Sequence, residues 1–412
     1  MTEKEKGPLM SLEETQSLES TYVMHTFARK PVKLAEGRGM EVRDDEGKTY
    51  VDFIAGVGAD SLGHCHPKVA GAIAEQAQRL IHVSNYYYIE GRAELSKKIS
   101  DLLNTLVPEG ERTPWQSFYA NSGAEANECA TKLARLWSKR YSHGGQNIVT
   151  LDRSFHGRTL ATLAETAQPA KQELFRPLPG GFLHTPINDI PALEQMFADH
   201  PDGICGILIE PIQGESGVHP CTPEFLQAAE RLAHENGALL MLDEVQTGIY
   251  RCGDYPFAFQ HFGVTPDIVS IAKGIASGFP TGLCAARESV ARAFEPGDHG
   301  STFGGSCLAI AAASATLAAI EEEGIAQRVT EVGAYLRERL SQIEGIVEVR
   351  GLGLMVAAEL AEGIVASQVV ERGLEAGLLL NFTGPHTLRF LPPLVCSKAE
   401  VDLLAEKLPG LL

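Results

Sequence analysis

The sequence predicts an α/β protein with a large domain, whose mostly parallel sheet is flanked by helices, and a smaller α+β domain built from both ends of the chain. From about residue 67 to 320, helical patterns alternate with short apolar runs, as in sheets buried on both faces. Beyond about residue 325 the pattern changes to helices with paired strands. Near the N-terminus, residues 32–54 alternate in strand fashion around the turn Asp45–Lys48.

The length and composition indicate a globular protein of two domains. The chain has 412 residues, too many for one typical core, and 44% of them are hydrophobic and 21% charged. We assign residues 57–310 to the large domain, and residues 1–56 and 311–412 to the two parts of the small domain.

One βαβ unit is clear within the large domain. Strand 204–209 is followed by a helix with Thr222 as N-cap, Pro223 in its first turn and Gly237 past its end, and then by a strand that starts at residue 239. Such a unit implies parallel strands. Residues 1 to about 20 are polar and are expected to be helical or loose. In the C-terminal part we expect helices and the strands 347–349, 354–359, 378–380 and 388–390.

Charge and cysteine content exclude several classes of protein. The net charge of −18 argues against nucleic-acid binding, which needs a basic surface. The eight cysteines contain no CxxC pair, which favours reduced thiols and a cytoplasmic protein. No apolar run approaches the ~20 residues of a membrane span, and the N-terminus lacks the apolar stretch of a signal peptide. His64-Cys65-His66 has no further ligand nearby, so we expect no metal.

Two polar residues close neighbouring apolar runs. Asp243 follows residues 238–242, and Lys273 follows residues 267–272. Ligands of α/β sheets lie at the carboxyl ends of the strands, so both side chains are expected to face one crevice. A carboxylate and an amine placed there suit pyridoxal phosphate, which links covalently to a lysine and has an acidic partner at its ring nitrogen. The pair alone fits an ordinary strand-end aspartate and surface lysine better.

Further segments carry weaker signals. A helix begins at Ser122, Gly123 and Ala124, and free backbone N–H groups at a helix start favour a phosphate. Taken alone, this segment fits a plain capping box of Ser122 and Glu125 better. The segment 154–158 joins Phe155, His156 and Arg158, an aromatic ring for stacking and an arginine for a carboxylate. Additional hydroxyl and carboxylate candidates are Ser301, Thr302 and Glu215.

Eight motifs occur in one order that resembles the class III, fold-type I pyridoxal-phosphate aminotransferases, and most closely the acetylornithine aminotransferases. The resemblance runs from about residue 21 to 408. It rests on LGHCHP (62–67), NSGAEANE (121–128), SFHGRT (154–159), EPIQGESG (210–217), LLMLDEVQTG (239–248), PDIVSIAKG (266–274), HGSTFGG (299–305) and LRFLPP (388–393).

The resemblance implies a role in cofactor binding for matching residues. Lys273 resembles the lysine that carries the cofactor and moves the proton, and Asp243 the carboxylate that keeps the ring nitrogen protonated. Thr302 resembles a threonine that completes the phosphate site of the other subunit, which implies a homodimer with active sites at the interface. The remaining expected cofactor contacts are Ser122, Gly123 and Ala124 with the phosphate, Phe155 and Val245 on the ring faces, His156, and Gln246 near the phenolic oxygen.

The resemblance also implies the substrate site. Arg158 resembles the arginine that takes a substrate carboxylate, and Ser301 lines the amine-donor pocket. Arg389 and Glu215 resemble a switch pair that opens when 2-oxoglutarate binds. Two further positions bear on the donor: Phe27, where the family usually has a tyrosine, and Val57, where ornithine aminotransferases have a tyrosine and acetylornithine enzymes an aliphatic residue.

The implied function is transfer of the distal amino group of N2-acetyl-L-ornithine, or a close N-acylated ω-amino acid, to 2-oxoglutarate. The products are a semialdehyde and L-glutamate, and the expected context is arginine biosynthesis. Other readings remain open: an aminotransferase for ornithine, succinylornithine, 4-aminobutyrate or an acylated lysine precursor, an aminomutase on the same fold, or an inactive homologue. The intact set of Lys273, Asp243 and Arg389 argues against the last.

Overall fold

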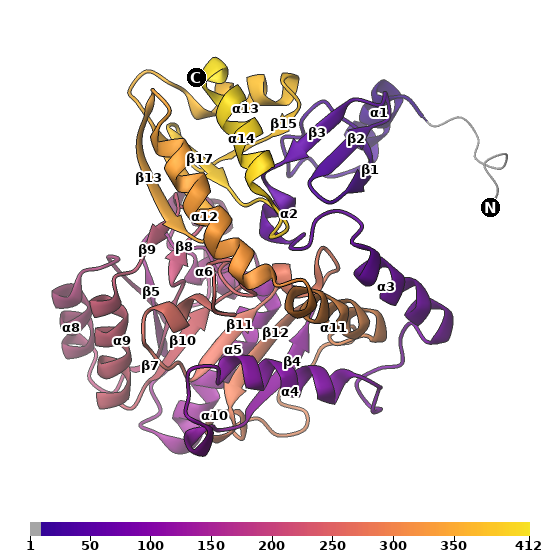
Figure 1. Ribbon diagram of the computed structural model, residues 1–412. Coiled ribbons are helices and arrows are strands. Elements are labelled where there is room, and N and C mark those ends of the chain that lie inside the picture. Colours follow the sequence, from indigo (N-terminus) through magenta and orange to yellow (C-terminus); the bar gives the residue numbers. More distant parts are fainter. Residues whose placement is uncertain (1–9) are drawn as a thin grey trace.

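A large mixed sheet forms the centre of the molecule. The computed structural model describes residues 10–412 (Figure 1). In this sheet β12 runs antiparallel to both of its neighbours, whereas the other pairings are parallel, so the predicted mostly parallel sheet is confirmed. The strand order is β4 (Trp115–Ala120), β12 (Gly282–Arg287), β11 (Ile268–Ile271), β10 (Leu239–Asp243), β7 (Ile204–Ile209), β5 (Asn147–Leu151) and β6 (Phe182–Thr185).

The strands of this sheet are apolar throughout because both faces are covered. In β10, Leu240 and Leu242 belong to one buried cluster with α9 (Pro223–Glu235), whereas Leu239 and Met241 belong to another with α5 (Gly123–Tyr141). Alternate residues of a strand point to opposite faces, so a strand between two helical layers needs apolar residues at every position. The predicted βαβ unit is confirmed, with Thr222 capping α9 by accepting from Phe225 N.

Further helices surround the central sheet. The α4 helix packs against β4, α8 against β6 and α9, and α3 against α11. In residues 10–412, no helix is both long enough and apolar enough to cross a membrane. The bounds are α3 (Pro67–Arg79), α4 (Arg92–Leu103), α6 (Leu160–Glu165), α7 (Pro169–Gln172), α8 (Ile190–Asp199), α10 (Glu288–Ala291) and α11 (Cys307–Glu322).

The two ends of the chain meet in one sheet. Strand β3 pairs in parallel with β15, and Val51 N donates to Gly377 O at 2.9 Å. The sheet order is β1 (Leu34–Arg38), β2 (Glu41–Asp44), β3 (Thr49–Asp52) and β15 (Leu378–Leu379). A second C-terminal sheet has the order β13 (Ile346–Leu352), β14 (Met355–Leu360), β17 (Thr387–Phe390) and β16 (Asn381–Phe382).

The remaining elements complete these ends. The segment from residue 1 to about 20, predicted to be helical or loose, contains most of α1. Residues 1–9 lie outside the described part of the chain. The predicted boundary at 310/311 falls inside α11 and the one at 56/57 inside α2, and the three-part division stays a prediction. The bounds are α1 (Leu12–Tyr22), α2 (Ala55–Gly58), β8 (Ile212–Gln213), β9 (His219–Pro220), α12 (Ile325–Ser341), α13 (Ala366–Glu375) and α14 (Lys398–Lys407).

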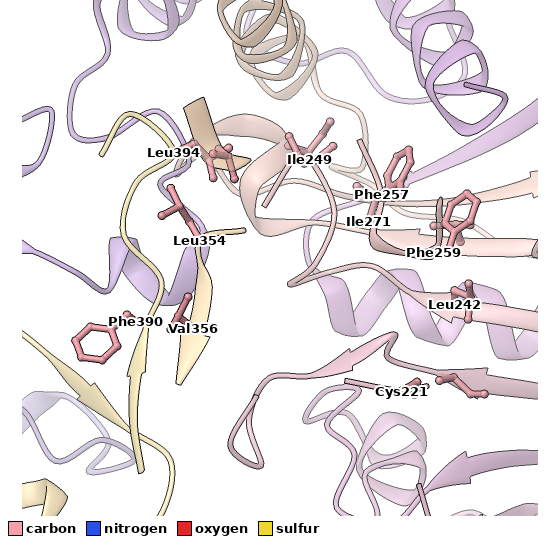
Figure 2. Close-up of a cluster of buried hydrophobic side chains, with 14 of the residues drawn as sticks. Cys221, Leu242, Ile249, Phe257, Phe259, Ile271, Leu354, Val356, Phe390 and Leu394 are labelled. Carbon is pink, nitrogen blue, oxygen red and sulfur yellow. The ribbon is translucent and has the colours of Figure 1, made fainter. Parts of the chain in front are cut away.

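A continuous apolar cluster joins the C-terminal strands to the large sheet. Figure 2 shows Phe390 and Val356 on the C-terminal strands and Leu242 and Ile271 on the large sheet. All four side chains are inaccessible to solvent. Burial of this kind stabilises by about 25 cal/mol per Å² of apolar surface, so the cluster fixes the position of β17, and with it Arg389, relative to the large sheet.

The segment α2 is a left-handed turn. Ala55, Gly56, Val57 and Gly58 have φ angles of 48°, 60°, 62° and 78°. Left-handed φ is unfavourable for a β-branched residue, so Val57 is held there by its surroundings. The chain around the turn is tied to the segment after Lys273: Ser61 Oγ donates to Gly274 O at 2.7 Å, and Gly278 N donates to Ala59 O at 3.0 Å.

His64 lies between two carboxylates that flank this turn, Asp52 and Asp60, and we call this arrangement the clamp. His64 Nε2 lies 2.9 Å from Asp52 Oδ2, and Nδ1 lies 3.0 Å from Asp60 Oδ2. Asp52 Oδ1 also accepts from Ala55 N at 3.0 Å. The hydrogen bonds to Asp52 and Asp60 raise the pKa of His64 to about 10, so the charged imidazolium is the stable form at neutral pH.

The clamp predicts a pH-dependent stability. Because the folded-state pKa is raised, the stabilisation is complete below the unfolded value of 6.5 and is lost as pH rises through about 10. His64→Gln is expected to lower the free energy of unfolding by roughly 1–3 kcal/mol at pH 6, less than the full shift implies because 24% of the side chain is exposed. Denaturant unfolding of both proteins between pH 6 and 10 measures this, and a gap that does not narrow with pH refutes the clamp.

Candidate active site

A cavity of about 370 Å³ opens where several strands of the large sheet end. Its walls come from segments after β4, β5, β7, β10 and β11, the crevice in which α/β proteins bind ligands. The structure brings most of the predicted site residues together here. Those that line the cavity are Ser122, Gly123, Ala124, Phe155, His156, Arg158, Glu215, Asp243, Val245, Gln246 and Lys273.

Asp243 is held in place by three partners. Its Oδ2 accepts from Asn127 Nδ2 at 2.7 Å and lies 2.8 Å from His156 Nδ1, and its Oδ1 accepts from Val245 N at 3.0 Å. The side chain is almost fully buried. These hydrogen bonds fix the orientation of the carboxylate at the cavity wall.

His156 is a buried partner of the Asp243 carboxylate. Burial disfavours its protonation, but the hydrogen bond to Asp243 and the charges of Asp243 and Glu210 outweigh burial and raise the pKa of His156. Its Nε2 atom is buried without a hydrogen-bond partner among the described residues. Glu210 lies close by and accepts from Phe155 N at 2.9 Å, and burial raises the pKa of Glu210 to about 7. Both shifts favour the protonated forms of His156 and Glu210, which lie close to Asp243.

Lys273 extends into the cavity from a strained turn. Its φ is 48°, an uncommon value for this residue type, and it begins a short 3₁₀ helix that ends at Ala276. Burial lowers the pKa of its amine, although the Glu215 and Asp243 carboxylates oppose the shift. Within residues 10–412 the amine has no hydrogen-bond partner, so it is free to react.

The N-terminus of α5 forms one end of the cavity. Ser122 is the N-cap, and its Oγ accepts from Glu125 N at 3.2 Å, so the capping role is present. The hydroxyl proton stays available for another acceptor. A Cβ atom at Gly123 would lie 2.7 Å from Val245 Cγ1, so only glycine allows Val245 to pack on this turn. Free N–H groups and the helix dipole favour an anion here.

Arg389 and Glu215 form an ion pair in which the arginine is buried and the carboxylate is partly exposed. Arg389 Nη1 lies 2.6 Å from Glu215 Oε1 and also donates to Gly214 O at 3.1 Å. Gln246 Nε2 donates to the same Glu215 oxygen at 3.1 Å. Burial raises the pKa of Glu215, but the charges of Arg389 and Lys273 outweigh it and lower the pKa overall. Arg389 is 2% exposed, and its Nε has no partner among the described residues.

Besides Arg389, which meets the cavity through Glu215, four predicted site residues are not among those that line it. Phe27 is 76% exposed, and Val57 packs against a small apolar cluster that includes Ile212 and Leu391. Ser301 Oγ accepts from Asn121 Nδ2 at 3.3 Å, and Asn121 lines the cavity, whereas Thr302 is exposed. The roles of all four stay predictions.

Sequence reasoning missed Asn127 and Thr281. Asn127 follows Gly123 by one helical turn, and this spacing on α5 was a usable signal for its contact with Asp243. Thr281 lines the cavity, is 4% exposed and has a hydroxyl oxygen without a partner among the described residues. Its segment carried no such signal.

The sequence and structure are similar to known proteins along almost the whole chain. A family model described as class-III aminotransferase matches residues 23–412. The chain is 44% identical over 404 residues to the acetylornithine aminotransferase of Methanocaldococcus jannaschii, covering 97% of this chain and 98% of that protein. It is 45% identical to the acetylornithine aminotransferase of Methanothermobacter thermautotrophicus, with 97% and 98% covered.

Solved structures of aminotransferases are also similar to this chain over almost its whole length. The ornithine aminotransferase of Toxoplasma gondii superposes with a TM-score of 0.90 at 31% identity, covering 98% of this chain and 95% of that one. The acetylornithine aminotransferase of Elizabethkingia anophelis superposes with a TM-score of 0.83 at 31% identity, covering 98% and 99%.

Proposed function

The chain belongs to the class III aminotransferase family, and on this premise we propose that it transfers the distal amino group of N2-acetyl-L-ornithine, or of a close N-acylated ω-amino acid, to 2-oxoglutarate. The products are the semialdehyde of the donor and L-glutamate. The observation that carries the proposal is one cavity lined by the amine of Lys273, the buried Asp243 carboxylate and Glu215, which pairs with Arg389.

Enzymes of this family depend on pyridoxal 5′-phosphate, and the cavity fits that cofactor. When bound, the cofactor supplies an electron-accepting ring that carries the amino group between the two half-reactions. Lys273 would hold it covalently, Asp243 would keep its ring nitrogen protonated, and the start of α5 at Ser122–Ala124 would bind its phosphate. Val245 and Phe155 would pack on its two faces.

Each of these residues has a physical reason to act as proposed. The three hydrogen bonds of Asp243 fix the orientation of the carboxylate that would face the protonated ring nitrogen. The lowered pKa of Lys273 increases the neutral fraction of its amine, and only that form can take a proton from the donor carbon. His156 acts through Asp243, because its Nδ1 contacts the carboxylate.

The ion pair would let one site accept two differently charged substrates. While Glu215 neutralises Arg389, this arginine offers the amine donor no free positive charge. When 2-oxoglutarate enters, Arg389 would release Glu215 and bind the α-carboxylate. Gln246 already contacts both members of the pair, at 3.1 Å to Glu215 and 3.4 Å to Arg389, and would retain Glu215 after the exchange.

The acetylated donor is preferred over free ornithine for a reason of charge. Free ornithine would bring an α-ammonium into the cavity, where Glu215 is paired with Arg389 and Asp243 with His156. Desolvating an unpartnered ammonium costs a few kcal/mol, and acetylation removes that charge. The structural similarity to an ornithine aminotransferase makes ornithine the alternative donor.

A donor panel tests this assignment. With 2-oxoglutarate as acceptor, N2-acetyl-L-ornithine is expected to exceed ornithine by at least ~10-fold in kcat/KM, about 1.4 kcal/mol of transition-state discrimination. Glutamate formed is the readout, and Val57→Tyr is expected to narrow the gap. Equal rates for the two donors contradict the donor assignment, and turnover without any 2-oxo acid indicates an aminomutase.

We also propose a cytoplasmic homodimer that serves arginine biosynthesis. An exposed aromatic surface supports the dimer: Tyr86, Tyr87, Tyr88 and Phe303 are 93%, 65%, 102% and 62% exposed. Exposed apolar patches of this kind are typical of interfaces. The patch adjoins Ser301 and Thr302, so a second copy docked there would receive both residues near its own cavity. Sedimentation of the purified protein measures the oligomeric state.

A further inference from the structure

Two cations lie against one aromatic ring at the cavity wall. The Arg158 guanidinium carbon is 5.3 Å from the centroid of the Phe155 ring, and Lys171 Nζ is 5.2 Å from the same centroid. Phe155 and Arg158 both line the cavity. Lys171 comes from α7, a different element, so the fold brings the second cation to the ring from outside the motif that contains the first.

Neither cation has a carboxylate partner in the described chain. Within residues 10–412, Arg158 and Lys171 form no ion pair, and the Lys171 ammonium donates only to the neutral Gln168 Oε1. Nearby carboxylates have other partners, since Glu215 pairs with Arg389 and Glu210 accepts from Phe155 N. Burial and then the charge of Arg158 lower the pKa of Lys171. An anion that contacts both cations would relieve this repulsion.

Lys171 is held beside the ring by its own helix. The neighbouring Gln172 is buried, and its amide nitrogen donates to Leu163 O at 3.1 Å and to Thr166 O at 2.8 Å. Pro169 begins the helix and fixes its first φ angle. The lysine side chain therefore starts from a backbone position that the fold holds in place.

We propose that Lys171 is the second cation of the substrate-carboxylate subsite and that it binds, together with Arg158, the α-carboxylate of the amine donor. The inference rests on the proposed function and adds a specificity-determining residue to it. The same two cations receive the distal carboxylate of 2-oxoglutarate, whose other carboxylate is taken by Arg389. Donors that lack a carboxylate gain nothing from Lys171.

A pair of unreactive ligands isolates this contact in the holoenzyme. N2-acetyl-L-norvaline has the acyl group, carbon chain and carboxylate of the donor but no distal amine, and N-butylacetamide also lacks the carboxylate. Lys171→Met keeps the length of the stem and removes the charge, whereas Lys171→Arg keeps the charge. Lys171→Met is expected to raise the Kd of N2-acetyl-L-norvaline about 10-fold, the scale of one hydrogen bond to a charged group. Lys171→Arg is expected to retain binding, and neither variant changes the binding of N-butylacetamide.

Kinetics give an independent readout. For N2-acetyl-L-ornithine, Lys171→Met is expected to raise KM with kcat almost unchanged, because the lost interaction is the same in the ground state and the transition state. For N-acetylputrescine, which is the same donor without the carboxylate, KM is expected to stay the same. Thermal unfolding of each variant establishes that the fold is retained.

Two results overturn the proposal. Equal weakening of both unreactive ligands means that Lys171 only packs on Phe155, and unchanged binding in Lys171→Met means that it makes no contact. The donor assignment fails separately, if wild-type enzyme transfers no amino group from N2-acetyl-L-ornithine. The comparison of N2-acetyl-L-norvaline with N-butylacetamide then still decides the role of Lys171, because it needs no turnover.

Discussion

Lys273→Ala is expected to reduce turnover by a factor on the order of 10⁵ or more, the scale of loss when a covalent catalytic residue is removed. The variant loses both the covalent attachment of the cofactor and the amine that moves the proton. Lys273 is the only lysine among the described residues that line the cavity, whereas Lys171 reaches the Phe155 ring from α7. Steady-state glutamate formation measures the loss.

Chemical trapping identifies the lysine directly. Borohydride reduction of the wild-type holoenzyme followed by peptide mass spectrometry is expected to find the cofactor on Lys273, and reduction of the variant is expected to find none. Lys97→Ala is a matched control, because Lys97 is exposed on α4 and pairs with Asp101. A label on any lysine other than Lys273 would refute the assignment.

Arg389→Ala is expected to impair the half-reaction with 2-oxoglutarate more than the half-reaction with the amine donor. The loss should be roughly 2–5 kcal/mol, the scale for truncating one member of a buried charge pair. The variant removes the group that binds the α-carboxylate and leaves Glu215 without its cation, at 2.6 Å in the wild-type protein. Stopped-flow absorbance follows the two half-reactions separately.

Two companion variants sharpen this test. Glu215→Ala leaves Arg389 without its carboxylate and is expected to favour donors with a free α-amino acid head, such as glutamate. Arg389→Lys keeps the charge but not the planar fork that binds a carboxylate through two nitrogens, so its loss should be intermediate. Equal losses in both half-reactions of Arg389→Ala contradict the switch.

The sequence predicted the centre of the site because simple rules govern it. Apolar runs gave β10 and β11, and the rule that ligands lie at carboxyl ends placed Asp243 and Lys273 in one crevice. The structure pairs these strands in parallel, with Asp243 opposite Ser270, three residues before Lys273. The burial of a strand and the position of its carboxyl end follow from local pattern, so they are accessible to sequence reasoning.

Contacts between loops were not accessible in this way. His156, a partner of Asp243, comes from the loop after β5, and no periodicity relates this loop to β10. The left-handed φ of Val57 opposes the preference of a β-branched residue, and it arises only because the segment around it is anchored to the Lys273 turn. Lys171 reaches Phe155 through the position of α7, which the motifs do not encode.

The parallel pairing of β3 with β15 has a consequence for biosynthesis. During translation, the three antiparallel strands β1, β2 and β3 leave the ribosome long before β15, the strand that completes their sheet. The edge of β3 therefore stays unpaired until Leu378 and Leu379 have been made. Loss of the last forty or so residues would leave the same edge open permanently. Nascent and truncated chains are therefore expected to depend on chaperones far more than the finished protein.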